Sequence, residues 1–341
     1  MSERIRIGQI GVCHEHAAGK MNTLRRMPGV FEIVGFVDDR GTAAPKAAGR
    51  DLEPFAGLKR MTEQDLFATP GLRAVTVETP NNDLVPAALR CMEKGLAIHM
   101  DKPAGEGDAL ADFKRLLSGC REKRLPFQMG YMFRNNAAMQ FCLRARKLGW
   151  LGDVFEIQAG MSHDYGGEEY QDYIAKFKGG IMFNLGCHFI DFIVFLMGRP
   201  QKITPFLKSA PGYPCGVRNN CLAVLEYAHA TATIRACSKE VRGGSHRRLT
   251  VCGTKGSIDL SPIERFDGRP LEMRLTLREG NAEYEAGEHI LNMGIKQDRY
   301  EDQLAELAKM IRGEMENPYT CEHDLLVQEA VLAASGYTEW K

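Results

Sequence analysis

A chain of 341 residues is long enough to form two domains rather than one. Its 44 basic and 44 acidic side chains cancel, so no basic excess is present to bind nucleic acid. No apolar run approaches the ~20 residues that span a bilayer, and the N-terminal residues lack the apolar stretch of a signal peptide. The ten cysteines include no C-x-x-C pair. We therefore expect a cytoplasmic protein with reduced cysteines, no metal site, and neither nucleic acid nor membrane as a partner.

The first part of the chain alternates strand-like and helix-like patterns. Strand-like runs span residues 5–10, 31–37, 74–77, 97–100 and 126–130. Helical spacing runs from Ala17 to a stop at Pro28-Gly29, and again over residues 84–94 and 109–123. Strands that alternate with helices in this way predict a Rossmann-type, doubly wound parallel sheet.

The second part has a different texture, with short strand-like runs joined by tight turns. These runs span residues 154–159, 221–227, 231–236, 249–252 and 257–260, and helical patterns cover 137–147, 299–312 and 325–335. They predict an α+β domain with an open, mostly antiparallel sheet. We place the domains at 1–127 and 128–341 and leave open a return of the C-terminal helix to the first domain. An uncovered sheet face that carries Leu222, Val224 and Leu225 would make the protein a homo-oligomer, a dimer or tetramer.

The turn after the first predicted strand has the place of a dinucleotide-binding loop. Of the G-x-G-x-x-G fingerprint it retains only Gly11, since Cys13 and His16 replace the other glycines. An acidic pair closes the second predicted strand, where a carboxylate accepts hydrogen bonds from an adenosine ribose and favours NAD over NADP. The two histidines are either exposed turn residues or face the pyrophosphate or the substrate. The candidate cofactor-binding residues of this region are Gly11, Val12, Cys13, His14, His16, Asp38 and Asp39.

A further polar group follows the predicted strand at residues 74–77. Thr79, Pro80 and Asn81 lie at a strand end, which is where ligands bind in open α/β sheets. Thr and Asn there can hydrogen-bond a ribose or a carboxamide. The same residues also form a turn that caps the next helix, and both interpretations can hold together.

Two ionisable groups are candidates for proton transfer. Lys102 follows Asp101 at the end of a predicted strand and precedes a proline, so it either relays a proton beside a cofactor or is an ordinary solvated charge. His188 lies on a predicted helix, four residues after Asn184 and three before Asp191, which could orient its imidazole. The alternative is a satisfied histidine on a core-facing helix.

These segments together resemble the Gfo/Idh/MocA oxidoreductases, the glucose–fructose oxidoreductase and inositol dehydrogenase-like family, over nearly the whole chain. Residues 95–103 are similar to the family's G-K-H-V-x-x-E-K-P segment, and residues 179–191 to its G-G-x-x-x-D-x-G-x-H-x-x-D segment. Residues 130–134 match its G-Y-x-x-R entry to the second domain. The resemblance implies a Rossmann domain and NAD(P)-linked oxidation or reduction of sugars, polyols and related molecules.

The resemblance also implies roles for individual residues. It makes His188 the base and Lys102 its partner, with Asn184 where the family has an aspartate and Asp101 where it has a glutamate. An amide cannot exchange a proton as a carboxylate does, so a diverged lyase, hydrolase or non-catalytic regulator is the alternative function. The expected catalytic residues are Lys102, Asn184, His188 and Asp191; Asp101 and Lys102 are also expected to bind the cofactor, and Lys102, Tyr131, Arg134, His163, Asn184 and His188 the substrate.

Overall fold

The computed structural model describes residues 3–41, 52–164 and 167–341, and the contacts within the chain divide it into two units. The first unit comprises Met1–Tyr131 together with Arg299–Gln328, and the second comprises Met132–Asp298 with Glu329–Lys341. This division places Tyr131 and a C-terminal segment in the first unit, and the domain boundary after residue 127 stays a prediction.

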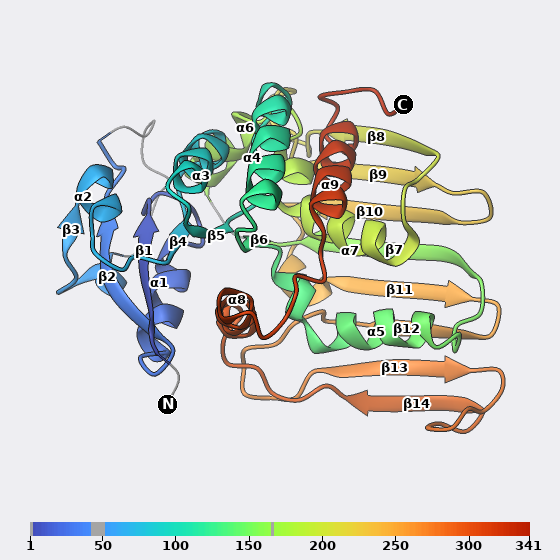
Figure 1. Ribbon diagram of the computed structural model, residues 1–341. Helices are drawn as coiled ribbons and strands as arrows, with labels where there is room; N and C mark the ends of the chain where they lie inside the picture. The colour runs from blue at the N-terminus through green and yellow to red at the C-terminus, as the bar shows by residue number, and fades with distance from the viewer. Residues whose placement is uncertain (1–2, 42–51, 165–166) are drawn as a thin grey trace. The chain divides into compact units, whose positions relative to one another are not determined.

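The first unit contains a six-stranded parallel sheet in the order β3-β2-β1-β4-β5-β6 (Figure 1). This order, which reverses direction between β1 and β4, defines a doubly wound Rossmann-type sheet and confirms the predicted fold class. Its strands are β1 (Ile5–Ile10), β2 (Phe31–Val37), β3 (Arg60–Met61), β4 (Ala74–Val77), β5 (Ala97–Met100) and β6 (Phe127–Met129). Its helices are α1 (Ala17–Arg26), α2 (Glu63–Phe67), α3 (Leu84–Glu93), α4 (Leu110–Glu122) and α8 (Glu301–Arg312).

The core of the first unit includes residues far apart in the sequence. Apolar side chains of α1 and α8 pack with those of β1 and β2 in one buried cluster. Burial of this apolar surface is the main driving force for closing the unit. The cluster includes Ile5, Ile7, Met21, Leu24, Phe31, Leu304 and Leu307.

Gly11 sits where no other residue fits, at the turn between β1 and α1. Its φ of +95° lies in the region that side chains rarely adopt. A Cβ at this position would lie 2.6 Å from backbone atoms of Glu78 and Thr79. Gly11 therefore allows the turn to approach the end of β4 closely.

The second unit contains an eight-stranded sheet in the order β14-β13-β12-β11-β7-β10-β9-β8 (Figure 1). Only β7 and β10 pair in parallel, so the sheet is mostly antiparallel as predicted. Its strands are β7 (Val154–Ser162), β8 (Lys202–Lys208), β9 (Asn220–Glu226), β10 (Thr231–Cys237), β11 (Arg248–Gly253), β12 (Gly256–Leu260), β13 (Glu272–Leu277) and β14 (Gly287–Asn292). Its helices are α5 (Ala137–Lys147), α6 (Glu168–Ala175) and α7 (Cys187–Met197), while α9 (Cys321–Ala334) contains the boundary between the units.

The two faces of this sheet differ in burial. Along β9, Cys221, Ala223 and Leu225 are buried, whereas Leu222 and Val224 alternate with them and are half-buried. Since successive side chains of a strand point to opposite faces, Leu225 belongs to the core and not to the open face. The expectation that Leu225 covers an interface is therefore wrong, while Leu222 and Val224 do lie on the open face.

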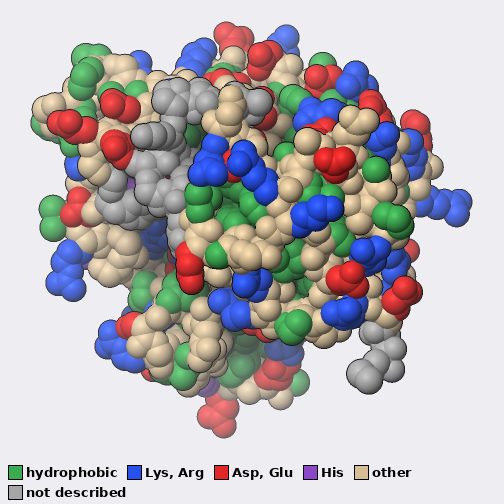
Figure 2. All heavy atoms as spheres, turned by 90° about the vertical axis from the view of Figure 1, so that its left-hand side faces the viewer, with side chains coloured by type: hydrophobic (Ala, Val, Ile, Leu, Met, Phe, Trp, Pro, Cys, Tyr) green, Lys and Arg blue, Asp and Glu red, His purple; other side chains and the backbone are tan. Residues whose placement is uncertain are grey.

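The surface carries charges of both signs, as the balanced composition predicts. Figure 2 shows acidic and basic side chains interspersed over one face of the molecule. All ten cysteines are free thiols. Within the described ranges, no helix combines the length and apolar character needed to cross a membrane.

Candidate functional site

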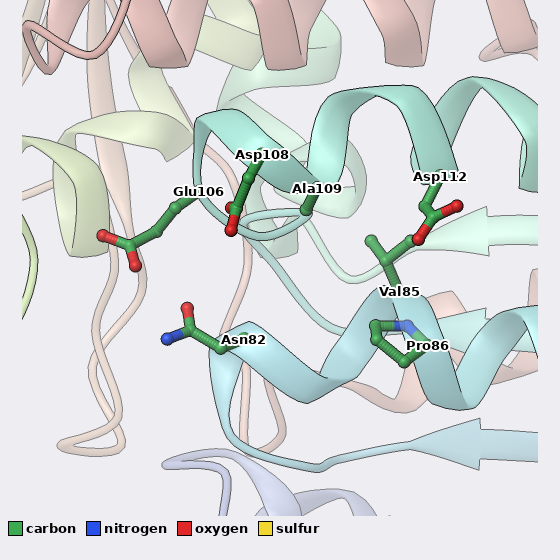
Figure 3. A pocket seen from close by; sticks show the side chains of 7 residues that line it. All are labelled: Asn82, Val85, Pro86, Glu106, Asp108, Ala109 and Asp112. Atoms are coloured by element: carbon green, nitrogen blue, oxygen red, sulfur yellow. The ribbon is translucent and has the colours of Figure 1, made fainter.

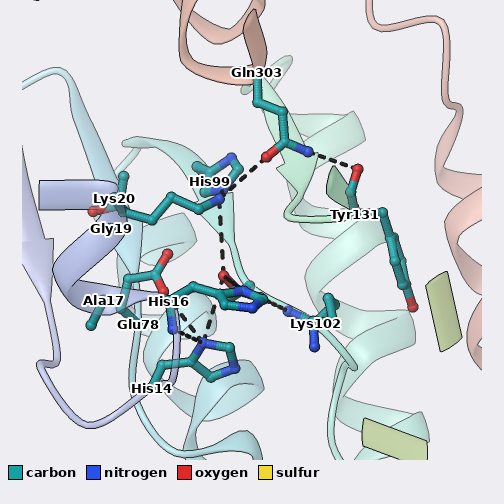
Figure 4. A network of polar contacts seen from close by, with 12 residues as sticks. His14, His16, Ala17, Gly19, Lys20, Glu78, His99, Lys102, Tyr131 and Gln303 are labelled. Atoms are coloured by element: carbon teal, nitrogen blue, oxygen red, sulfur yellow. Dashed lines mark hydrogen bonds and ion pairs between the residues drawn. The ribbon is translucent and has the colours of Figure 1, made fainter. Parts of the chain in front are cut away.

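A group of titratable side chains gathers at the carboxyl ends of β1, β4 and β5 in the first unit (Figure 4). The strand order reverses at this end of the sheet, which is where open α/β sheets bind ligands. We call it the buried polar cluster, and it consists of His14, His16, Lys20, Glu78, His99, Asp101 and Gln303. All of these side chains are buried except that of His16, which is 12% exposed. The structure thus excludes the interpretation of His14 and His16 as exposed turn residues.

Three hydrogen bonds stabilise the turn that carries the two histidines. The backbone N–H of Val12 donates to Asp39 Oδ1 at 2.9 Å. Gln9 Nε2, on β1, donates to the carbonyls of Gly11 and Ala17 at 3.0 and 3.2 Å. Of the acidic pair after β2, Asp39 therefore stabilises the turn, a role that the sequence did not reveal.

Asp38 lies beside two arginines, Arg40 and Arg60, which no motif of the sequence points to. Arg40 donates to it through Nε at 2.8 Å and Nη2 at 2.5 Å, and Arg60 Nε lies 3.3 Å away. The hydrogen bonds from Arg40 lower the pKa of Asp38. The carboxylate is ionised but its charge is compensated, so Asp38 repels a 2′-phosphate less than an isolated carboxylate would.

Asp101 is the negative centre of the buried polar cluster. His16 Nδ1 lies 3.0 Å from its Oδ2, and His14 Nδ1 lies 3.6 Å from the same oxygen. Burial alone would raise the pKa of Asp101, but the neighbouring histidines hold it well below the usual range. For Glu78, burial and the charge of Asp101 raise the pKa well above the usual range. The negative charge of this carboxyl pair therefore resides mainly on Asp101.

Lys20 and His99 form the inner side of the cluster. Lys20 Nζ contacts His99 Nε2 and donates to Gln303 Oε1 at 3.3 Å, while His99 Nδ1 pairs with Gln128 Oε1 at 2.8 Å. Burial lowers the pKa of Lys20, and that of His99 to about 3. Neither residue was a predicted site residue, although Lys20 falls on the buried face of its helix between Ala17 and Leu24. A lysine on the buried face of a helix was thus the feature of the sequence that could have identified Lys20.

Lys102 is fully buried, which excludes the alternative of a solvated charge. Its backbone N–H donates to Asp101 Oδ1 at 2.7 Å, and its carbonyl accepts from Asn81 Nδ2 at 3.4 Å. Thr79 Oγ1 is buried and has no hydrogen-bond partner among the described residues. The hydrogen bond from Asn81 to Lys102 thus joins the β4 and β5 ends, with Pro80 before Asn81 at the start of a short 3₁₀ turn.

Tyr131 is fixed through its backbone. Its carbonyl accepts a 2.7 Å hydrogen bond from Gln303 of α8, whose own carbonyl accepts from Gln128. The tyrosine ring points away from the buried polar cluster (Figure 4). The cluster and the tyrosine side chain are therefore separate features of the first unit.

A pocket of the first unit lies between α3 and α4 (Figure 3). Glu106, Asp108 and Asp112 supply three carboxylates to its lining, together with Asn82. A lining of this charge repels phosphates and carboxylates. This pocket is therefore no candidate for the pyrophosphate of a dinucleotide.

In the second unit, Asp191 is bound to Arg134. Both side chains are nearly fully buried, and Arg134 donates through Nε at 3.1 Å and Nη2 at 2.7 Å. The carboxylate is thus matched by a guanidinium, a partner that the spacing to His188 did not predict. His188 is fully buried, and its ring centroid lies 5.3 Å from that of Phe133.

Asn184 lies in a π-helical turn, Met182–Gly186, directly before α7. Such turns are rare and are frequent at functional sites. Asn184 Nδ2 donates to the hydroxyl of Tyr170 at 3.0 Å, and that hydroxyl lies 3.2 Å from His163 Nε2. Burial and two nearby cations lower the pKa of His163 to about 3, so its neutral ring can accept from Tyr170. Tyr170 links two predicted substrate residues and was itself missed.

Comparisons with known proteins agree with this architecture. Residues 143–259 match the family model described as the GFO/IDH/MocA C-terminal domain. An uncharacterised oxidoreductase of Schizosaccharomyces pombe is 22% identical over 243 residues, which are 69% of this chain and 64% of the yeast protein. The scyllo-inositol 2-dehydrogenase (NAD(+)) of Bacillus subtilis is 23% identical over 270 residues, 75% of this chain and 72% of that protein.

A solved oxidoreductase of Agrobacterium radiobacter, in complex with NAD+, L-tartaric acid and magnesium, has the same fold. Its TM-score is 0.78 at 18% identity, with 98% of this chain and 96% of that chain covered. The two sheets thus define a protein with a Rossmann-type unit and a mixed-sheet unit. The family model over residues 143–259, together with these relatives, confirms the resemblance to the Gfo/Idh/MocA oxidoreductases found in the motifs.

Proposed function

We propose that the protein is an NAD(P)-dependent oxidoreductase that transfers a hydride between a nicotinamide and a secondary alcohol or ketone of a sugar, polyol or related small molecule. The observation that carries the proposal is the reversal of strand order between β1 and β4, with Gly11 and Asp38 at the adjoining strand ends. The Bacillus subtilis relative is named for NAD-dependent oxidation of an inositol, which supports this substrate class.

The residues at the strand ends fit a dinucleotide. Gly11 leaves room at the turn, Asp38 suits a ribose diol, and Thr79 offers a buried hydroxyl with no hydrogen-bond partner among the described residues. We propose that the cofactor is bound by the residues predicted for it from the sequence, and that NAD is favoured over NADP. When bound, the nicotinamide supplies the hydride acceptor.

The proton chemistry falls to this chain's own side chains. We assign His188 as the base that takes the hydroxyl proton and Lys102 as the group that polarises the same oxygen. Asn184, with Tyr170 and His163, would hold further hydroxyls of the substrate through hydrogen bonds. Asp191 would keep Arg134 in place.

The test of the proposal is a panel of sugars, inositols and sugar acids, followed at the absorbance of NADH with NAD and with NADP. Formation of reduced cofactor with at least one substrate supports the oxidoreductase. Tight cofactor binding without hydride transfer to any panel member contradicts it and favours a diverged lyase, hydrolase or regulator, for which the amide at Asn184 is the structural motive.

The choice between cofactors should depend on Asp38. In Asp38→Ala, the ribose loses its acceptor while Arg40 and Arg60 lose their counter-ion and can meet a 2′-phosphate. We expect NAD affinity to fall at least tenfold, roughly the value of one buried or charged hydrogen bond, and NADP affinity to hold or rise. Titration of both cofactors measures this. Asp267→Ala, which removes an exposed aspartate that also bridges two arginines, is the control and should change neither affinity; equal losses in Asp38→Ala would refute the assignment.

Asn184→Asp should lower activity on the preferred substrate. The amide of Asn184 donates to Tyr170, and an ionised carboxylate cannot donate, so the hydroxyl would turn from His163 toward the aspartate. We expect kcat/KM to fall roughly tenfold, the value of one such hydrogen bond. Steady-state kinetics in the wild-type and Tyr170→Phe backgrounds measure the coupling. A gain in activity, or the same loss without the hydroxyl, would show that the Tyr170 link is irrelevant.

The open face of the large sheet is the proposed homo-oligomer interface. Leu222 and Val224 on β9 and the 46% exposed Phe206 on β8 place apolar side chains on it, in register across the two strands. We expect a dimer or tetramer in light scattering at micromolar concentration, and dissociation in Val224→Arg because a charge would be buried there. Leu148→Arg, at an exposed position after α5, should leave the assembly intact. A wild-type monomer would contradict the interface.

A further inference from the structure

Two histidines and a carboxylate converge within the buried polar cluster in a manner suited to a metal ion. One ligand atom each of His14, His16 and Asp101 lies within 4.8 Å of the others. His16 Nδ1 is 3.0 Å and His14 Nδ1 is 3.6 Å from Asp101 Oδ2. The two histidines come from the turn after β1, and the aspartate follows β5, so distant segments supply one donor set.

The 3.6 Å separation of His14 Nδ1 from Asp101 Oδ2 matches that between neighbouring ligands of one ion. Bonds of about 2.0–2.2 Å in a tetrahedral site place adjacent donor atoms roughly 3.3–3.6 Å apart. The backbone N–H of His16 also points at His14 Nδ1, at 3.3 Å, a long hydrogen bond that an ion would replace. To admit an ion, His16 Nδ1 and Asp101 Oδ2 would have to move apart by roughly 0.3–0.6 Å from their 3.0 Å separation.

Glu78 can supply a fourth donor, and the burial of its carboxyl group is a second observation in favour of a bound cation. Its side chain is fully buried, and apart from the carboxyl group of Asp101 no described side chain forms a hydrogen bond with it. Oε2 lies 3.5 Å from His14 Nδ1. A buried carboxyl group of this kind either holds a proton or coordinates a cation. Lys20 Nζ lies 3.9 Å from Asp101 Oδ2 and makes its closer contacts with His99 and Gln303.

We propose that His14, His16 and Asp101, with Glu78 as the fourth ligand, bind a divalent transition-metal ion such as Zn²⁺. Two imidazoles with carboxylates suit zinc and its first-row neighbours, whereas Mg²⁺ and Ca²⁺ prefer oxygen ligands alone. The site ties the turn after β1 to the ends of β4 and β5. It would thereby fix a loop in which Cys13 and His16 replace two fingerprint glycines. Cysteine spacing gives no sign of this site, because none of its ligands is a cysteine.

The test is metal binding to the full-length protein. Protein stripped with a chelator is titrated with Co²⁺, whose visible absorption reports tetrahedral nitrogen and oxygen ligands, and reloaded with Zn²⁺ for elemental analysis. We expect about one ion per chain. His14→Ala, His16→Ala and Asp101→Asn should each weaken binding at least 100-fold, beyond the roughly 10–100-fold effect of changing a residue behind the ligands.

Two controls separate a ligand from a neighbour. His99→Gln changes a buried imidazole of the same cluster whose nitrogens are engaged by Lys20 and Gln128, and it should retain the ion. His229→Ala removes an exposed histidine of the second unit and should also retain it. The Co²⁺ spectrum of the unmutated protein provides a readout that does not depend on the folding of any variant.

Two results would overturn the metal site: binding well below one equivalent, or equal binding by the wild type and the His14→Ala/His16→Ala double variant. A proton shared between Glu78 and Asp101 would then explain their burial. The metal titration requires no turnover, so its outcome is independent of the NADH assay. If an ion binds but no hydride is transferred, the metal site is supported and the proposed function is refuted. If hydride is transferred but no ion binds, the proposed function is supported and the metal site is refuted.

Discussion

Replacing His188 by alanine is expected to lower turnover by roughly 10²–10⁴-fold, the range for loss of a general base. The imidazole is fully buried beside Phe133, at the first turn of α7, where helix and ring packing fix its orientation. Because the residue belongs to the second unit and the proposed cofactor residues to the first, NAD affinity should remain nearly unchanged. Steady-state kinetics and a cofactor titration on the same preparation measure both quantities.

The control for His188→Ala is the same substitution at a histidine with no proposed role in catalysis. His229→Ala removes an exposed imidazole from the same unit and should keep wild-type turnover. His188→Gln, which retains a polar group but no base, should be as slow as His188→Ala. A fully active His188→Ala would refute the proton transfer proposed here, whatever the substrate.

Arg134→Met is expected to reduce the free energy of unfolding of the second unit by about 3–5 kcal/mol, the usual cost of removing one partner of a buried ion pair. The variant leaves the Asp191 carboxylate buried without its guanidinium. Both tryptophans of the chain, Trp150 and Trp340, belong to the second unit, so their fluorescence in urea follows that unit. This choice of probe matters because unfolding of a two-unit protein need not be a single transition.

Two further variants show whether burial of the charge is the cause. Arg134→Met/Asp191→Leu removes both charges and should regain most of the lost stability. Arg274→Met breaks a pair with Glu288 in which both side chains are at least half exposed, and should change stability by less than about 1 kcal/mol. A small loss in Arg134→Met, or no recovery in the double variant, would contradict the importance of this pair.

The regular elements were predictable where the hydrophobic period was strong and long enough. The strands at residues 5–10 and 31–37 and the helix at 137–147 have the predicted bounds. β3 has only two residues, too few for any period to register. β13 does alternate buried and more exposed residues over Glu272–Leu277, so that signal was present and was overlooked.

The candidate site was predictable as a list of strand ends but not as a set of partners. Asp101 and Lys102 were found because they follow a buried strand. That Asp191 pairs with Arg134, 57 residues away, depends on tertiary packing that no local spacing encodes. Tyr170 was missed for the same reason, since only the π-helical turn brings Asn184 to its hydroxyl.

The order of synthesis bears on how the first unit is completed. Its core includes Leu304 and Leu307 of α8, and Gln303 holds both Lys20 and the carbonyl of Tyr131. When the N-terminal residues leave the ribosome, these contacts have not yet been made, and Met132–Asp298 of the second unit is translated before α8. The Rossmann-type unit therefore cannot reach its final packing when only Met1–Tyr131 has been translated, although N-terminal domains commonly fold first. Its last step waits for the segment Arg299–Gln328.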